Sequence, residues 1–61
     1  MTSLFAEERR AEIEELIREQ NSVEVQDLCD KFGVSSSTIR RDLQELADQE
    51  VIRRTHGGAV I

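Results

Sequence analysis

Apolar side chains recur at helical spacing along the first third of the chain. The stripe consists of Ile13, Leu16 and Ile17, and it is continued upstream by Ala6, Arg9 and Arg10. This periodicity predicts a helix from Leu4 or Phe5 to about Gln20, with Thr2 and Ser3 as candidate caps for its N-terminus.

Two further stretches have the same periodicity and are separated by a short turn. The first contains Val25, Leu28, Cys29 and Phe32, and the second contains Ile39, Leu43 and Leu46. Asn21-Ser22 breaks the first helix, and we expect Val23 to be a single extended residue or a very short strand. A second helix should begin near Val25 and end at Gly33, and a third should run from a Ser35 cap to about Gln49. On this pattern Cys29 is a small core residue rather than a reactive thiol.

The last eleven residues change to a strand pattern. Residues 51–55 are rich in β-branched side chains, Gly57-Gly58 is a turn signal, and a second apolar segment follows over 59–61. This predicts a two-stranded hairpin. The fold class is therefore α+β and mainly α: three helices followed by a C-terminal β-hairpin.

Chain length and cysteine content limit the architecture further. Sixty-one residues form one domain with a modest core. Cys29 has no second cysteine to pair with, and His56 has no companion ligand, so neither a disulfide nor a metal site is expected. Support from oligomerisation or from a further domain is the remaining expectation.

The charge distribution divides the chain into two halves. The net charge is −5, which taken alone argues against nucleic acid as a partner. Residues 1–30 hold three arginines against nine carboxylates, whereas residues 31–61 hold five basic against four acidic side chains. Much of the acidity lies in a row that we interpret as a solvated face of the first helix: Glu8, Glu12, Glu15 and Glu19. An acidic face beyond a Debye length of about 8 Å weakens DNA binding without preventing it.

The predicted third helix carries side chains that suit a DNA major groove. Opposite its apolar stripe lie Ser37, Thr38, Arg41, Gln44, Glu45 and Asp48, with Arg40 on the flank. Arginine pairs with guanine, glutamine pairs with adenine, and hydroxyls contact phosphates or base edges. The short turn at 33–35 would fix the second helix across the third, so that one helix contacts the DNA backbone while the other enters the groove.

The predicted hairpin adds a second cationic element. Arg53, Arg54 and His56 surround the Gly57-Gly58 pair, so positive charge lies beside a tip without side-chain bulk. Such a ribbon can approach phosphates or a minor groove. The alternative is that the two glycines only satisfy a tight turn.

Two long segments resemble one protein family. Residues 38–43 (Thr-Ile-Arg-Arg-Asp-Leu) followed by Leu46, and residues 52–59 (Ile-Arg-Arg-Thr-His-Gly-Gly-Ala), are similar to the DeoR family of transcriptional regulators. The resemblance extends to 23–28 and 32–35, and so covers nearly the whole chain. It implies a winged helix-turn-helix domain over 1–61, with the helix-turn-helix at about 23–42 and the wing at about 51–61. Members of the family usually repress operons for sugar or metabolite use, and usually continue into a sugar-phosphate-sensing domain that is absent from this chain.

Two positions depart from the family pattern, and a third carries an unexpected charge. Glu50 stands where glycine is common, so either a left-handed glutamate costs about 1 kcal/mol or the helix ends differently. Glu24 stands where a capping residue such as serine is common. Asp42 lies at the edge of the core stripe, where we expect it to pair with a neighbouring basic or amide group.

These observations predict sequence-specific binding of double-stranded operator DNA by the reading head of a regulator, with a repressor expected. The predicted DNA-binding residues are Ser36, Ser37, Thr38, Arg40, Arg41, Gln44, Arg53, Arg54, His56, Gly57 and Gly58. The alternative is a winged-helix module that contacts protein through the acidic first helix. An enzyme is not expected, because the sequence has no nucleophile–base pairing, phosphate loop or metal cluster. We expect no cofactor, no membrane span, a cytoplasmic setting and a homo-oligomeric full-length protein, with any sugar-phosphate effector on the missing domain.

Overall fold

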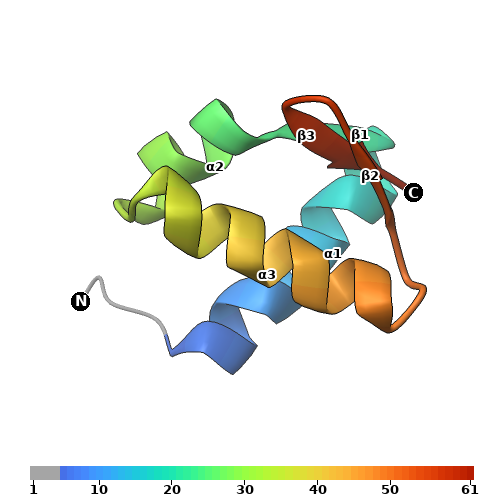
Figure 1. Cartoon of the computed structure of the whole chain (residues 1–61), viewed down its shortest axis with the longest axis horizontal. Helices are drawn as coiled ribbons and strands as arrows, with labels where there is room; N and C mark the ends of the chain where they lie inside the picture. Colours follow the sequence, from blue (N-terminus) through green and yellow to red (C-terminus); the bar gives the residue numbers. More distant parts are fainter. Residues whose placement is uncertain (1–4) are drawn as a thin grey trace.

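The computed structural model describes residues 5–61, and over this range three helices and three short strands follow one another along the chain. They are α1 (Ala6–Gln20), β1 (Ser22–Glu24), α2 (Val25–Phe32), α3 (Ser36–Asp48), β2 (Arg53–Thr55) and β3 (Gly58–Val60). The mainly helical α+β class is confirmed, and the helix bounds match the prediction to within one or two residues. The candidate caps Thr2 and Ser3 and the possible start at Leu4 lie outside the described residues. Figure 1 shows α3 crossing α1, with α2 beside α3 and the C-terminal end of α1 next to the sheet.

The helix ends follow the predicted turn chemistry. Gly33 has a φ of 68°, and its N–H donates to the carbonyl of Cys29 at 2.8 Å. The Oγ of Ser35 accepts the backbone N–H of Thr38 at 3.3 Å, as an N-cap should. Both predicted helix signals are therefore confirmed, and they keep the connection between α2 and α3 to three residues.

The sheet has one strand more than the predicted hairpin. The hairpin strands β2 and β3 are antiparallel, and β1 pairs on the other edge of β3 to give the order β1-β3-β2. Val23, expected to be extended, lies opposite Ala59 at the centre of β1. The predicted two-stranded hairpin is therefore confirmed, and its pairing with β1 is the part that the sequence did not reveal, because a three-residue strand is too short to show an alternating pattern.

The hairpin turn lies one residue earlier than predicted. Thr55 pairs with Gly58, so the two loop residues are His56 and Gly57, and Gly58 is the first residue of β3. Gly57 has a φ of 83°, in the left-handed region that favours glycine. Gly58 is needed for a different reason: a Cβ there would lie 2.1 Å from the backbone oxygen of Val23. The predicted Gly57-Gly58 tip is therefore wrong, because Gly58 is buried where β1 approaches β3.

The turn of the hairpin also supports the start of α2. Glu24 is the N-cap residue of this helix, and its side chain makes no capping hydrogen bond. The N–H of Val25 instead donates to the carbonyl of Gly57 at 2.9 Å. A carbonyl from the hairpin thus satisfies a backbone donor at the end of α2, which accounts for a helix start without a capping side chain.

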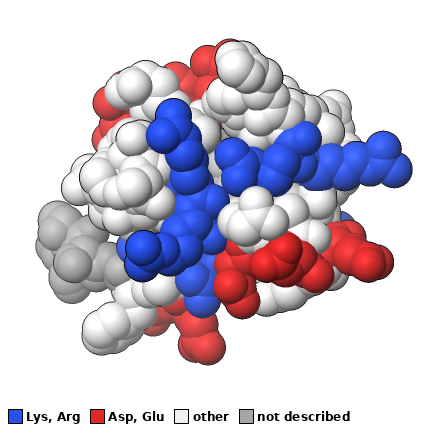
Figure 2. Space-filling view, viewed as in Figure 1, with Lys and Arg blue, Asp and Glu red and all other residues white. Residues whose placement is uncertain are grey.

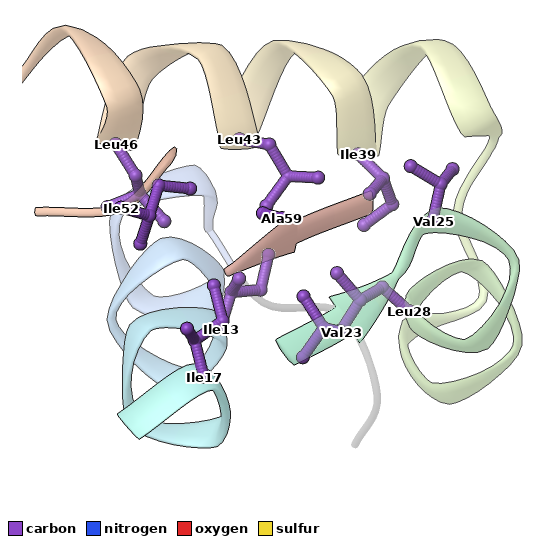
Figure 3. Packing of buried hydrophobic residues seen from close by; sticks show 10 residues of the cluster. All are labelled: Ile13, Ile17, Val23, Val25, Leu28, Ile39, Leu43, Leu46, Ile52 and Ala59. Atoms are coloured by element: carbon purple, nitrogen blue, oxygen red, sulfur yellow. The ribbon is translucent and has the colours of Figure 1, made fainter. Parts of the chain in front are cut away.

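One core joins every element except β2. Its buried apolar residues are Ile13, Ile17, Val23, Val25, Leu28, Ile39, Leu43, Leu46, Ile52 and Ala59. Figure 3 shows the three α3 side chains pointing toward those of α1, α2 and β1. Cys29 is half-buried and packs against this cluster, in agreement with its predicted core role. Val51 and Ile52, predicted as strand, precede β2, and Ile52 is buried in the core.

Glu50 adopts the left-handed conformation, which is one of the two alternatives that the sequence left open. Its φ is 64°, and its N–H donates to the carbonyl of Ala47 at 2.9 Å. The helix therefore ends as it would with glycine, and a glutamate occupies the left-handed position.

The two wing glycines give a matched test of close approach against turn geometry. We expect Gly58→Ala to lower the free energy of unfolding by about 3 kcal/mol or more, because its methyl group would overlap backbone. Gly57→Ala should cost only about 1–2 kcal/mol, because the space around it is open and only its φ is strained. Urea unfolding followed by circular dichroism measures both losses, and equal losses would contradict the assignment.

Relief of the strain at Glu50 should stabilise the chain. Glu50→Gly is expected to raise the free energy of unfolding by about 1 kcal/mol, because glycine has no left-handed penalty. The neighbouring Gln49 has a φ of −83°, so Gln49→Gly should lower stability instead. Thermal melting of both variants checks the prediction, which a loss of stability in Glu50→Gly would refute.

Candidate nucleic-acid interface

The outer face of α3 presents the polar side chains that the sequence placed there. Ile39, Leu43 and Leu46 are buried on its inner side. Arg40, Arg41 and Gln44 are exposed, together with Ser36 and Ser37, and Thr38 is half-buried. The predicted orientation of this helix is confirmed.

Hydroxyl groups gather at the N-terminus of α3. The Oγ of Ser35 lies 3.1 Å from the Oγ of Ser37 and 3.1 Å from the Oγ1 of Thr38. These contacts order the first turn of the helix, where the earliest backbone N–H groups point out of the helix end. A helix terminus of this kind, with its partial positive charge, suits a phosphate oxygen.

The wing, defined as residues 51–61, divides its predicted contact residues between the surface and the interior. Arg53, His56 and Gly57 are exposed, and Arg54 is half-buried. Gly58 is buried against β1, which leaves it a structural role rather than an exposed position.

Arg54 links the wing to α3. Its Nη1 donates to the Oε1 of Gln44 at 3.4 Å, and its Nε donates to the carbonyl of Gly58 at 3.5 Å. The Nε2 of Gln44 in turn donates to Asp48 Oδ1 at 2.9 Å. The structure therefore brings two predicted DNA-binding residues, 44 and 54, into contact across two elements.

Asp42 pairs with arginines of α1. The Nε and Nη2 of Arg9 both donate to its carboxylate, the second at 3.1 Å, and Arg10 Nη1 lies 3.4 Å from Asp42 Oδ1. The Asp42 side chain is 2% exposed and that of Arg9 is 11% exposed. The hydrogen bond and the charge of Asp42 raise the pKa of Arg9 above its ordinary value, so its guanidinium stays protonated.

The role of Arg9 and Arg10 was missed from the sequence. The expectation that Asp42 pairs with a basic or amide group is confirmed, but its partner lies 33 residues away in the chain. The available signal was the position of Arg9 and Arg10 on the apolar stripe of the first helix, where a charge needs a partner.

The surface charge is segregated. Figure 2 shows lysine and arginine atoms gathered in two arms over the face that α3 crosses, with carboxylates along the lower edge of that face. The acidic row Glu8, Glu12, Glu15 and Glu19 is exposed on α1, as predicted for a solvated face. A chain of net charge −5 thus still presents a local cationic surface.

The described residues also bear on metal binding and on membrane insertion. Within 5–61 no group of three or more His, Cys, Asp and Glu side chains is placed to hold a metal ion. In the same range, none of the helices combines the length and apolar character that crossing a membrane requires.

Comparison with known proteins identifies similar sequences. Residues 9–61 match the model of the DeoR-like helix-turn-helix domain. The chain is 49% identical over 53 residues to the HTH-type transcriptional regulator GlpR of Haloferax volcanii, which covers 87% of this chain and 21% of that protein. It is 48% identical over 54 residues to the glycerol-3-phosphate regulon repressor of Escherichia coli, covering 88% of this chain and 21% of that protein. A putative galactitol utilization operon repressor of Escherichia coli is 50% identical over 52 residues, with 85% of this chain and 46% of that protein covered. No solved structure matches the chain.

The contact between Asp42 and Arg9 should support the fold more than any surface pair. Asp42→Ala leaves Arg9 without its buried partner, and we expect a loss of about 3–5 kcal/mol in the free energy of unfolding. Glu45→Ala on the exposed side of the same helix is the control and should change stability by less than about 0.5 kcal/mol. Urea unfolding of both variants measures the difference, and similar midpoints would show that the ion pair is not needed.

Proposed function

The chain belongs to the DeoR-like helix-turn-helix family, and from this membership and the geometry of its surface we propose how it binds DNA. It is a helix-turn-helix DNA-binding domain, and its relatives are named as transcriptional regulators and repressors. We propose that it reads operator DNA for a repressor of a sugar- or metabolite-use operon. The role is binding rather than catalysis.

The orientation of Arg40 and Arg41 carries this proposal. Both arginines are exposed on the early turns of α3, while Ile39 between them and the helix cap is buried. An α-helix fits the major groove, and bidentate contact between arginine and guanine is its commonest specific contact. The cap at Ser35 and the buried face of α3 hold this presentation without bound DNA.

Nine of the eleven predicted residues take a contact role that follows from their place. Arg41 and Ser37 read base edges in the major groove, and Arg40 and Thr38 hold the register of α3, with Ser36 near the backbone. Gln44 adds a base contact further along the helix. On the wing, Arg53 and His56 approach phosphates, and Gly57 keeps the tip free of side-chain bulk.

One copy of this domain covers only a half-site. The chain spans 21% of the length of the first two relatives described above, so a longer protein can supply both a dimer contact and a sensor. We propose that homo-oligomerisation places two domains on two half-sites and that a sugar-phosphate effector acts on a separate domain. We propose a cytoplasmic location, because the regulator must reach its operator DNA.

A protein-binding role is the second candidate, favoured by the net charge of −5 and by the exposed acidic row of α1. The dependence of affinity on salt concentration distinguishes DNA binding from protein binding. Binding to DNA phosphates releases counterions, so the logarithm of affinity should fall steeply and linearly with the logarithm of salt concentration. Fluorescence anisotropy with a labelled duplex measures this slope, and a slope near zero would favour the protein-binding role.

Removal of Arg41 tests the groove-facing helix directly. Arg41→Ala should weaken duplex binding by about 1–3 kcal/mol and leave the melting temperature unchanged, because the side chain is exposed. Arg18→Ala, on α1, removes the same charge from an exposed residue outside the proposed interface and is the control. Equal affinity losses in the two variants would remove Arg41 from the contact surface.

A further inference from the structure

The two adjacent arginines of β2 differ in exposure and in hydrogen bonding. Arg53 is exposed and, within residues 5–61, its side chain makes no hydrogen bond, whereas Arg54 is half-buried and donates to two acceptors. Neighbouring side chains on a strand point to opposite faces of the sheet, which places only one of them toward α3. We propose that Arg54 is a positioning residue for base readout by Gln44, and that Arg53 carries the phosphate contact of the wing. The proposal deepens the proposed function and rests on it.

The contacts of Gln44 fix which end of its amide faces which way. Arg54 can only donate, so the group 3.4 Å from its Nη1 must be the oxygen Oε1. The carboxylate of Asp48 can only accept, so the group 2.9 Å from its Oδ1 must be the nitrogen Nε2. A flipped amide would place two donors together at Arg54 and two acceptors together at Asp48. The two charged neighbours therefore select one orientation.

This orientation leaves the amide able to read a base. Oε1 has a second lone pair, and Nε2 has a second N–H, so one acceptor and one donor are still free in a fixed order. Adenine in the major groove requires that combination, with N6 donating and N7 accepting. Without Arg54 or Asp48 the amide can rotate, and its donor and acceptor lose their fixed order.

The wing thereby contributes to specificity without touching the base. The guanidinium of Arg54 is anchored within the hairpin through the carbonyl of Gly58 and reaches Gln44 on α3. The position of the hairpin relative to α3 is in turn set by β1, whose residue Glu24 pairs with Gly58. A shift of the wing would therefore alter the amide that reads the base.

Three charge-changing variants separate positioning from simple attraction. The unaltered chain first selects its preferred duplex from a pool of short duplexes with a randomised centre. Each base pair of that duplex is then changed in turn. Arg54→Ala removes a positive charge and should weaken binding, whereas Asp48→Ala removes a negative charge and should strengthen it. Both should reduce discrimination at one and the same base pair from about tenfold to about threefold. Arg53→Ala should keep that discrimination and lower the salt slope by about one.

The same variants show which outcome overturns the proposal. If Arg54→Ala weakens binding to every duplex by one factor and Asp48→Ala leaves discrimination intact, Arg54 is only a further phosphate contact. Gln44→Ala combined with Arg54→Ala should discriminate no worse than Gln44→Ala alone, and additive losses would also refute positioning. Arg54→Lys keeps the charge but lacks the fork, so partial rescue of affinity without rescue of discrimination supports the proposal.

A measurement on the free chain tests the contact independently of DNA binding. The side-chain amide of Gln44 gives a pair of NMR proton signals, which should be separated and sharp in the unaltered chain. They should move toward the positions of an exposed glutamine in Arg54→Ala and in Asp48→Ala, but not in Arg53→Ala. If the unaltered chain bound no duplex, the proposed function would fail, and these signals would still decide whether Arg54 holds Gln44. Unmoved signals in both variants would refute the contact.

Discussion

The ion pair between Asp42 and Arg9 sets the orientation on which the rest of the domain depends. Asp42 lies between the exposed Arg41 and the buried Leu43 on α3, and its carboxylate is held by α1. Because a buried carboxylate without its partner costs several kcal/mol, α3 cannot rotate about its axis without breaking this pair. The rotation that buries the apolar stripe is the same rotation that turns Arg40 and Arg41 outward.

The strand β1 gives the wing a fixed position relative to the helices. Pairing of Val23 with Ala59, the hydrogen bond from Val25 to Gly57, and the absence of a side chain at Gly58 all act at one junction. A hairpin paired only with itself would be marginal at three residues per strand. With β1 added, the sheet and the helix-turn-helix form one unit in which α3 and the wing keep a defined relation.

Local signals were enough to predict the helices. The contacts between residues that are distant in the chain could not be predicted from such signals. Gly33 and Ser35 form their capping hydrogen bonds with residues three or four positions away, so the turn before α3 could be predicted from the sequence. Helical periodicity likewise predicted that Arg40 and Arg41 face outward. The pairing of β1 with β3, the partner of Asp42 and the contact between Arg54 and Gln44 join residues that the sequence alone does not place together. Gly58 shows the difference clearly: the sequence indicates a turn, whereas a neighbouring strand requires the glycine.

The central claim is that α3 and the wing contact one duplex together while the acidic face of α1 stays free. A chemical-shift titration of the isotope-labelled chain with its preferred duplex tests this residue by residue. We predict that amide signals of Ser36 to Gln44 and of Arg53 to Gly57 move together at one ratio of DNA to protein, while those along the exposed row from Glu8 to Glu19 remain in place. Shifts confined to α1, or on α3 without the wing, would contradict the account.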